Sequence, residues 1–169
     1  MRIETLQASR IILRPIRLSD APWVFAMRSD KEYGKYTDIP QYKDPEEAVR
    51  YINRVLKEME SQSCYVWANT SASEGTFLGS ICLWNFTEDR LSAEIGYDLL
   101  PEYRGKGYMG EAVSLVLDFA FDRLGLASVF ANLHGDHTKS LNVLERAGFR
   151  KMKAEGEFVL YEIKRTAGQ

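Results

Sequence analysis

A basic, glycine-rich segment, Arg104-Gly105-Lys106-Gly107-Tyr108-Met109-Gly110, constrains this chain more than any other feature. A strand-like run, Ala93 to Leu99, precedes it, and apolar residues at helical spacing follow it as far as Leu124. Glycines let the backbone approach an anion closely, and a helix N-terminus directs N–H groups and partial positive charge toward it. Because Arg104 and Lys106 add full positive charges, the segment predicts a strand–loop–helix unit that holds a phosphorylated cofactor.

The same segment contains Gly-x-Gly-x-x-Gly, the fingerprint of dinucleotide-binding folds. In those folds the first glycine follows the strand almost directly and the motif opens the domain, whereas here Pro101 to Arg104 intervene and about a hundred residues come first. A Walker loop is excluded because no Gly-Lys-Ser or Gly-Lys-Thr follows. A glycine-rich turn with exposed basic side chains is the plain alternative to a phosphate site.

Length and composition indicate one ordinary domain. With 169 residues, of which 45% are hydrophobic and 27% charged, the chain is expected to form a single domain over residues 1–169. The net charge of −2 leaves no basic footprint, so we expect no nucleic-acid partner. The first residues lack the apolar core of a signal peptide, and the most apolar stretch, residues 113–121, is too short to cross a bilayer. We expect a cytoplasmic protein that does not contact a membrane.

The cysteines and histidines predict neither a disulfide nor a metal centre. Cys64 and Cys82 fall in strand-like runs and are expected to be buried, reduced thiols. His134 and His137 lack a nearby cysteine and the i, i+4 spacing that places two ligands on one helical face. No metal is expected.

Hydrophobic periodicity predicts helices and strands along the whole chain. A helix over about 20–29 would be capped by Ser19 or Asp20, and a second would start at Asp44, with an ordered loop at 30–43 between them. A third helix follows the glycine segment and ends at Gly125, and a fourth covers about 138–147. Strands are predicted at 11–14, 64–68, 77–86, 93–99, 128–133, 149–154 and 157–163.

The order of these elements predicts the sheet. Strands 64–68, 77–86 and 93–99 follow one another through short turns, which favours an antiparallel meander. The helix after the glycine segment joins strand 93–99 to strand 128–133, so these two are expected to be parallel, and the last two strands form a hairpin. The prediction is an α/β (α+β) fold with one mixed, mostly antiparallel sheet and about four helices.

Three segments, in this order along the chain, carry a resemblance to a known superfamily. The central one reads Glu94-Ile95-Gly96-Tyr97, then Pro101-Glu102-Tyr103-Arg104-Gly105-Lys106-Gly107-Tyr108, then Glu111-Ala112. The flanking ones read Arg10-Ile11-Ile12-Leu13-Arg14-Pro15 with Ser19-Asp20-Ala21, and Ser140-Leu141-Asn142-Val143-Leu144-Glu145-Arg146-Ala147-Gly148-Phe149. The centre resembles the acetyl-CoA-binding motif of GNAT N-acetyltransferases, and the flanks are similar to their RimJ/RimL-like branch. The resemblance spans almost the whole chain.

The resemblance implies an enzyme that uses acetyl-CoA. The cofactor's pyrophosphate would meet the N–H groups from Gly105 to Gly110, and its pantetheine arm would pair with backbone near Tyr97, Leu99 and Leu100, beside a splay between the two parallel strands. In this family the amine attacks the thioester directly, which suits a chain without a convincing nucleophilic triad. The cofactor-binding residues would be Tyr97, Leu99, Leu100, Arg104, Gly105, Lys106, Gly107, Tyr108, Met109, Gly110, His137 and Ser140.

This chain departs from the family pattern at three positions. Met109 stands where the family usually has glycine or alanine, although methionine is a familiar variant in the RimJ/RimL-like branch. His137 replaces a common asparagine and still has ring nitrogens that could touch the cofactor. Leu144 occupies the position of a tyrosine general acid in many members. The leaving thiolate would then take its proton from another group, for which Ser140 and water are the candidates.

Glu94 is the candidate general base, because a carboxylate acting through water could take the proton that the amine loses. The competing interpretation is a solvent-facing glutamate in an alternating strand. Ser140 is a candidate acid or thiol-binding residue, against a plain first-turn residue of a helix. His137 is expected to contact the cofactor or cap the helix, with a base role as its alternative. Tyr161 is a further candidate acid.

An acceptor pocket and the acceptor itself are less well determined by the sequence. Aromatic side chains could line such a pocket or belong to the core, namely those of Tyr33, Tyr36, Tyr42 and Trp84. The RimJ/RimL resemblance makes a protein N-terminal amine the first acceptor to test, and a small amine such as a polyamine or an aminoglycoside is the alternative. A non-catalytic acyl-CoA-binding module is a third hypothesis, motivated by Leu144. The chain could act as a monomer or a homodimer.

Overall fold

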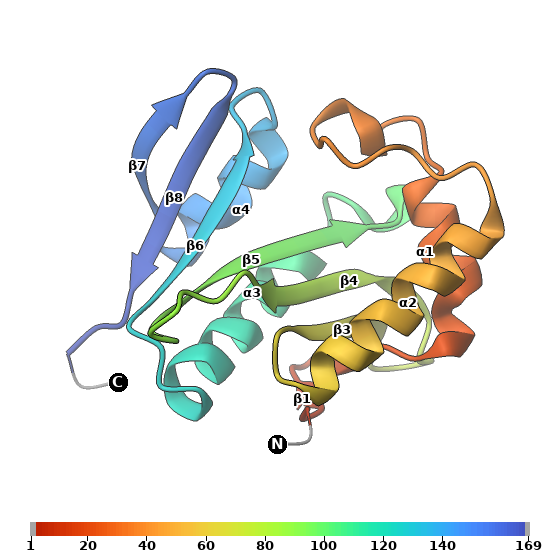
Figure 1. Cartoon of the computed structure of the whole chain (residues 1–169), viewed down its shortest axis with the longest axis horizontal. Coiled ribbons are helices and arrows are strands. Elements are labelled where there is room, and N and C mark those ends of the chain that lie inside the picture. The colour runs from red at the N-terminus through yellow and green to blue at the C-terminus, as the bar shows by residue number, and fades with distance from the viewer. Residues whose placement is uncertain (1–2, 168–169) are drawn as a thin grey trace.

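A single eight-stranded sheet organises the chain in our computed structural model, which describes residues 3–167 (Figure 1). The strands lie in the order β1-β2-β3-β4-β5-β6-β8-β7. Their bounds are β1 Leu6–Gln7, β2 Ile11–Pro15, β3 Tyr65–Ser71, β4 Phe77–Trp84, β5 Ser92–Leu99, β6 Ser128–His134, β7 Arg150–Glu155 and β8 Phe158–Lys164. The α-helices are α1 Ala21–Arg28, α2 Pro45–Glu60, α3 Tyr108–Asp118 and α4 Thr138–Ala147.

The strand pairing confirms the predicted fold class. Neighbouring strands are antiparallel throughout, including the β3-β4-β5 meander and the β7-β8 hairpin, except for the parallel pair β5-β6. That parallel ladder runs only from Ser92 and Ser128 to Glu94 and Phe130. Beyond Glu94 the two strands diverge, and Figure 1 shows the V-shaped opening between them. The splay predicted beside strand 93–99 is therefore present.

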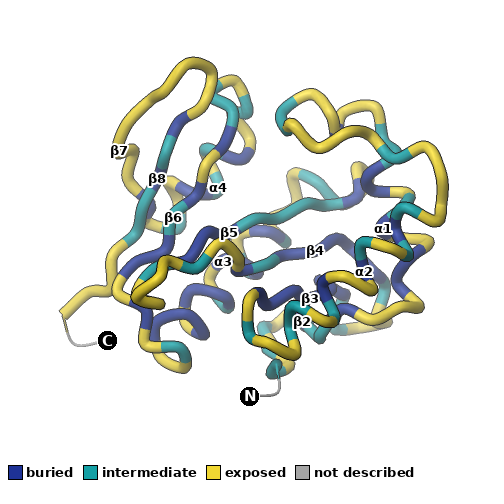
Figure 2. Tube along the Cα trace, in the orientation of Figure 1, coloured by how far each residue is buried: buried dark blue, intermediate teal, exposed yellow. Residues whose placement is uncertain are grey.

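Two apolar clusters hold helices against the two faces of the sheet. Val113 and Val116 of α3 pack in one cluster with Ile95 of β5 and Trp67 of β3. The other cluster joins α1 and α2 to the opposite face of β3 and β4. Figure 2 shows the buried residues concentrated in these layers, whereas β7 at the edge is exposed along its length. Because side chains alternate along a strand, the even-numbered residues of β5 face the α1–α2 side.

The strand predicted at 64–68 extends further than expected. It starts at Tyr65 and continues to Ser71, beyond the predicted end at residue 68. Pairing with β2 explains this, because Asn69 lies opposite Leu13 and the Thr70 hydroxyl donates to the Ile12 carbonyl at 2.8 Å. Cys64 lies just before the strand, and both cysteines are free thiols.

Asp20 does not cap α1 through its side chain as predicted. A 3₁₀ helix, Leu18–Asp20, precedes α1, and the Asp20 carboxylate pairs with the Arg14 guanidinium through two hydrogen bonds of 2.9 and 2.7 Å. It also accepts from the Arg17 amide at 3.0 Å. Bidentate, charge-assisted bonds between a guanidinium and a carboxylate are strong and fix the geometry of the pair, so the first motif segment is a structural clamp between β2 and α1.

The long helix after the glycine segment does not stay α-helical to Gly125. α3 ends at Asp118, and Phe119–Arg123 form a π-helical turn in which the Leu124 amide donates to the Phe119 carbonyl at 3.1 Å. Three consecutive residues, 119–121, are buried there. An ordinary α-helix faces a core with only part of each turn, and the wider turn brings all three inward. In the described part of the chain, no helix is long and apolar enough to cross a membrane.

Candidate active site

The glycine segment forms a backbone cradle at the start of α3. A 3₁₀ helix, Pro101–Tyr103, connects β5 to the loop, and Gly105 and Gly107 adopt left-handed conformations with φ of 74° and 85°. Gly107 is the N-cap of α3, so the first-turn amides from Tyr108 onward lack intrahelical acceptors. Left-handed backbone is strained for residues with a side chain. The loop therefore needs its glycines, and it presents N–H groups as the sequence predicts for a phosphate site.

Arg10 braces this loop from a distant part of the sequence. Its Nη1 donates to the Lys106 carbonyl at 2.9 Å, its Nε pairs with Glu111 in the first turn of α3, and its guanidinium lies 4.6 Å from the centre of the Tyr108 ring. A carboxylate at an anion-binding helix terminus would repel the ligand. Arg10 offsets that charge, a role that no sequence pattern indicated.

The Arg104 side chain points away from the loop it was expected to serve. Its Nε donates to the Leu99 carbonyl at 3.2 Å, and its Nη2 lies 3.7 Å from Asp30 after the end of α1. Arg104 thus joins β5 to the α1–α2 connection, while Lys106 lies exposed on the loop. The backbone, rather than the Arg104 charge, makes the cradle.

The three residues predicted to pair with pantetheine are not equivalent. The Leu100 amide donates to the Leu78 carbonyl at 2.9 Å, and its carbonyl accepts from the Tyr103 amide at 3.0 Å, so both groups bond within the chain. Since backbone groups alternate in direction along a strand, those of Tyr97 and Leu99 point to the other side, toward the opening between β5 and β6. The Leu99 carbonyl already accepts from Arg104 Nε, so the Tyr97 backbone and the Leu99 amide are the groups placed to pair with an extended ligand.

Glu94 is buried where β5 and β6 begin to diverge, with only 8% of its surface exposed. Its Oε1 accepts from Asn132 Nδ2 at 3.2 Å and from Asn85 Nδ2 at 3.4 Å. Burial raises the pKa of its carboxyl, and the two amides partly oppose that rise. The solvent-facing alternative for Glu94 is wrong, and its two asparagine partners were not predicted.

Ser140 lies across the opening from β5 and contacts Tyr97. Its Oγ is 2.8 Å from the Tyr97 hydroxyl, and burial raises the pKa of that phenol to about 12. The bond joins the start of α4 to the strand that borders the predicted pantetheine path. The Tyr161 hydroxyl, in contrast, donates to Glu145 at 2.9 Å on the α3–α4 side of the sheet. The Leu144 side chain belongs to the buried hydrophobic core.

His137 is the N-cap residue of α4, but its side chain makes no capping bond. Its ring stacks on that of Tyr36 with centroids 4.3 Å apart. Burial, and then the positive charge of Arg104, lower the pKa of this imidazole. The 30–43 connection, which includes a 3₁₀ helix at Tyr33–Lys35, thus reaches across the mouth of the opening to α4.

The other aromatic candidates have separate surroundings. Tyr33 and Tyr42 lie around the Arg28 guanidinium, at 5.7 and 5.5 Å from their ring centres. Trp84 is exposed beside Gly96, and a Cβ at Gly96 would lie 3.6 Å from its indole nitrogen. The same Cβ would lie 3.2 Å from Cys82 Sγ, so a side chain at Gly96, between Glu94 and Asp98 on β5, would crowd its neighbours.

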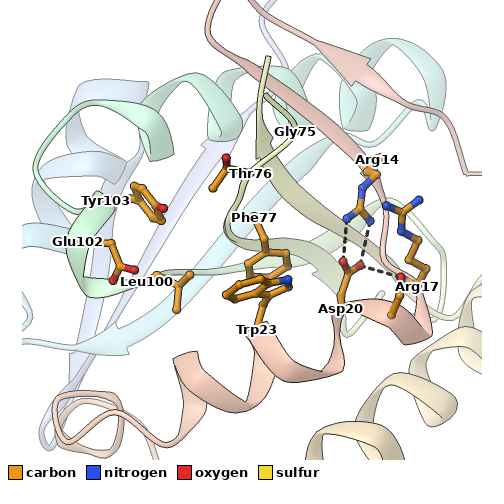
Figure 3. Close-up of a pocket in the computed structure, with 11 residues that line it drawn as sticks. Arg14, Arg17, Asp20, Trp23, Gly75, Thr76, Phe77, Leu100, Glu102 and Tyr103 are labelled. Atoms are coloured by element: carbon orange, nitrogen blue, oxygen red, sulfur yellow. Dashed lines mark hydrogen bonds and ion pairs between the residues drawn. The ribbon is translucent and has the colours of Figure 1, made fainter. Parts of the chain in front are cut away.

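The surface also carries a hollow of about 420 Å³, shown in Figure 3. Trp23 and Phe77 line it together with Leu100 and Tyr103, and the Arg14–Asp20 pair forms one side. Leu100 follows the far end of β5 from Glu94, so this hollow is not the place where Glu94 could act. No three His, Cys, Asp or Glu side chains within residues 3–167 are grouped to hold a metal.

Comparison with known proteins agrees with this geometry. Residues 10–150 match the acetyltransferase (GNAT) domain family. An uncharacterized N-acetyltransferase p20 of Bacillus licheniformis is 31% identical over 154 residues, which cover 88% of this chain and 84% of that protein.

Solved structures share the fold at lower identity. A GNAT-family acetyltransferase from Bacillus anthracis has a TM-score of 0.83 at 22% identity, with 95% of this chain and 98% of that one covered. The ribosomal L7/L12 acetyltransferase RimL, solved with coenzyme A, has a TM-score of 0.86 at 18% identity and the same coverage. The matched family spans most of the sequence, and this chain therefore belongs to the GNAT acetyltransferases.

Proposed function

We propose that this N-acetyltransferase moves an acetyl group from acetyl-CoA to the amine at a protein N-terminus. The observation that carries the proposal is the place of Glu94, a buried carboxylate at the point where β5 and β6 separate, on the strand that leads into the glycine cradle. An anion cradle, an unpaired strand edge and a buried base on one strand form a complete site for this chemistry.

The residues present fit the cofactor. The first-turn amides of α3 and the left-handed Gly105 and Gly107 suit a pyrophosphate, since a Cβ at Gly107 would lie 3.0 Å from Arg10 Nη2 and crowd the cradle. The Tyr97 backbone and the Leu99 amide are available to the pantetheine amides in the manner of an added strand. When bound, acetyl-CoA supplies the acetyl group as a thioester.

Glu94 takes the proton that the amine must lose before it attacks. Both amide bonds to its carboxylate end on Oε1, so Oε2 has no hydrogen-bond partner among residues 3–167 and is free to accept through a water. The C–N bond forms as the C–S bond breaks, and the sulfur leaves with the electron pair. The nitrogen sheds its second proton after the attack, and Ser140, whose hydroxyl contacts that of Tyr97, would pass this proton to the departing sulfur in place of the tyrosine that Leu144 replaces.

The choice of acceptor rests on the likeness of the fold and of the motifs to RimL, whose name records a ribosomal-protein substrate. A small amine is the second candidate, because a spermidine acetyltransferase SpeG chimera also shares the fold, with a TM-score of 0.78 at 19% identity. Both kinds of acceptor need the same base and cradle.

Thiol release from acetyl-CoA, measured against a panel of amines, tests the proposal. The panel contains peptides with free N-termini, the same peptides with blocked N-termini and internal lysines, polyamines and aminoglycosides. We expect turnover with free N-termini, and mass spectrometry should locate the acetyl group there. Turnover confined to small amines would reject the N-terminal acceptor and leave amine acetylation standing.

A further inference from the structure

Arg28, the last residue of α1, keeps hydrogen-bonding capacity that the protein does not use. It is only 9% exposed, its Nη1 donates to the Tyr42 hydroxyl at 2.8 Å, and its guanidinium lies 3.9 Å from the centre of the Tyr51 ring. Its Nε is buried and has no partner in the structure. A buried donor without an acceptor is costly and uncommon, so this N–H is an unfilled position.

Asp98 of β5 lies close to Arg28 without pairing with it. The charges of Arg28 and Arg104 both favour the ionised carboxylate, but burial outweighs them and raises its pKa to about 6. Within residues 3–167 no group donates a hydrogen bond to this carboxylate and no ion pair closes on it. A cation with spare donors and an anion with spare acceptors thus lie near each other.

These two side chains lie next to the transfer centre. Asp98 and Glu94 are on the same face of β5, with Gly96 between them. Gly96 pairs with Cys82 and has no side chain, and Cys82 Sγ and the Trp84 indole nitrogen border this position, at 3.2 and 3.6 Å from where a Cβ would lie. An amine held over Gly96 beside Glu94 would place the groups that follow it, at about 3.4 Å per residue, next to Asp98 and Arg28.

The chemistry of this pair distinguishes between classes of acceptor. A peptide group offers a carbonyl to Arg28 and an N–H to Asp98, and so satisfies both. A polyamine offers hydrogen-bond donors only, so the Arg28 N–H stays without an acceptor, and the positive charge of Arg28 repels the polyamine. We infer that Arg28 and Asp98 recognise the first peptide groups of a polypeptide N-terminus and select it over simple amines. This inference rests on the proposed function and names its acceptor-binding residues.

Paired acceptors and a matched control variant test the inference. The acceptors are a tetrapeptide amide with a free N-terminus and an alkyl diamine of similar length. The variants are Arg28→Met and Asp98→Asn, and the control is Arg54→Met, because the Arg54 guanidinium also lies over the Tyr51 ring, 5.5 Å from its centre, and is exposed. Loss of a charge-assisted bond should raise the peptide KM roughly 10- to 100-fold in Arg28→Met.

The KM for acetyl-CoA should stay unchanged in Arg28→Met, and diamine turnover should not fall. Equal losses with peptide and diamine, or an unchanged peptide KM, would overturn the inference. If Arg28→Met fails to fold, the isosteric Asp98→Asn decides, because its peptide KM must rise by about 10-fold while its melting temperature does not fall. Wild-type turnover of diamines but not peptides would also overturn it. No turnover with any amine would instead reject the proposed function.

Discussion

Replacement of Asp98 by asparagine should make the protein more stable at neutral pH. Asp98 lies partly buried on β5, and no hydrogen bond or ion pair from residues 3–167 compensates its charge. Burial raises its pKa from 3.8 to about 6, even though Arg28 and Arg104 act in the opposite direction. The folded state therefore disfavours the ionised carboxylate that the unfolded chain accepts without cost.

The magnitude follows from the pKa difference. The folded and unfolded pKa values of Asp98 differ by about two, and a pKa difference of one corresponds to about 1.4 kcal/mol, which gives about 3 kcal/mol of unfolding free energy. Partial contact with solvent reduces this to about 1–3 kcal/mol. The folded state binds the extra proton between the two pKa values, so wild-type stability falls as the pH rises from about 4 to about 6. Arg28, Tyr33, Tyr51 and Cys82 keep their protonation states in this window.

Urea unfolding at several pH values between 4 and 8 measures the effect. Asp98→Asn should exceed wild type by about 1–3 kcal/mol at pH 7–8, and this gain should fade toward pH 4. The exposed Asp38→Asn is the control and should change stability little at any pH. A difference that does not vary with pH, or a less stable Asp98→Asn, would refute the account of a buried and uncompensated carboxylate.

Three further changes test the cradle and the transfer centre. Gly107→Asp should weaken acetyl-CoA binding by more than about 10-fold in calorimetry with the fold kept, because it adds strain at φ 85° and negative charge at the anion site; unchanged affinity would contradict the placement of the phosphates. Glu94→Gln should lower kcat by about 10²–10⁴-fold with little effect on acetyl-CoA affinity, and the ascending limb of its pH–rate profile should vanish or move upward. A near-normal rate would transfer the base role to His137 or water. Tyr97→Phe removes the 2.8 Å contact to Ser140. It should lower kcat, and most strongly with acetyl thioesters whose thiol is a poor leaving group. A wild-type rate would make Ser140 an ordinary helix residue.

The sequence predicted the parts of the fold that depend on local chemistry. The glycine segment, the meander and the hairpin all follow from turn residues and periodicity, and the structure has them. The errors lie where distant segments meet. The strand 65–71 is longer than its polar end suggested because β2 pairs with it, and Asp20 serves Arg14 instead of a helix end.

The site was predictable only where one segment supplies it. The cradle lies within one loop, but its brace, Arg10, is separated from Lys106 by 96 positions, and Asn132 is separated from Glu94 by 38. Alternation along β5 gives the face of Glu94 but not what covers that face, so burial could not be decided from the sequence. Arg28 and Asp98 likewise belong to no motif, and only the packing of α1 against β4, the neighbour of β5 in the sheet, brings them together.

Glu94 and Asp98 lie on the same strand, β5, but their carboxylates have different surroundings. Burial raises the pKa of both, but their partners differ in charge. Neutral amides hold Glu94 in place without neutralising it, which leaves a carboxylate able to accept a proton. Two arginines near Asp98 favour its ionised form, which suits a group that binds through its charge. The different environments of the two side chains thus support the roles proposed for them, proton transfer for Glu94 and acceptor recognition for Asp98.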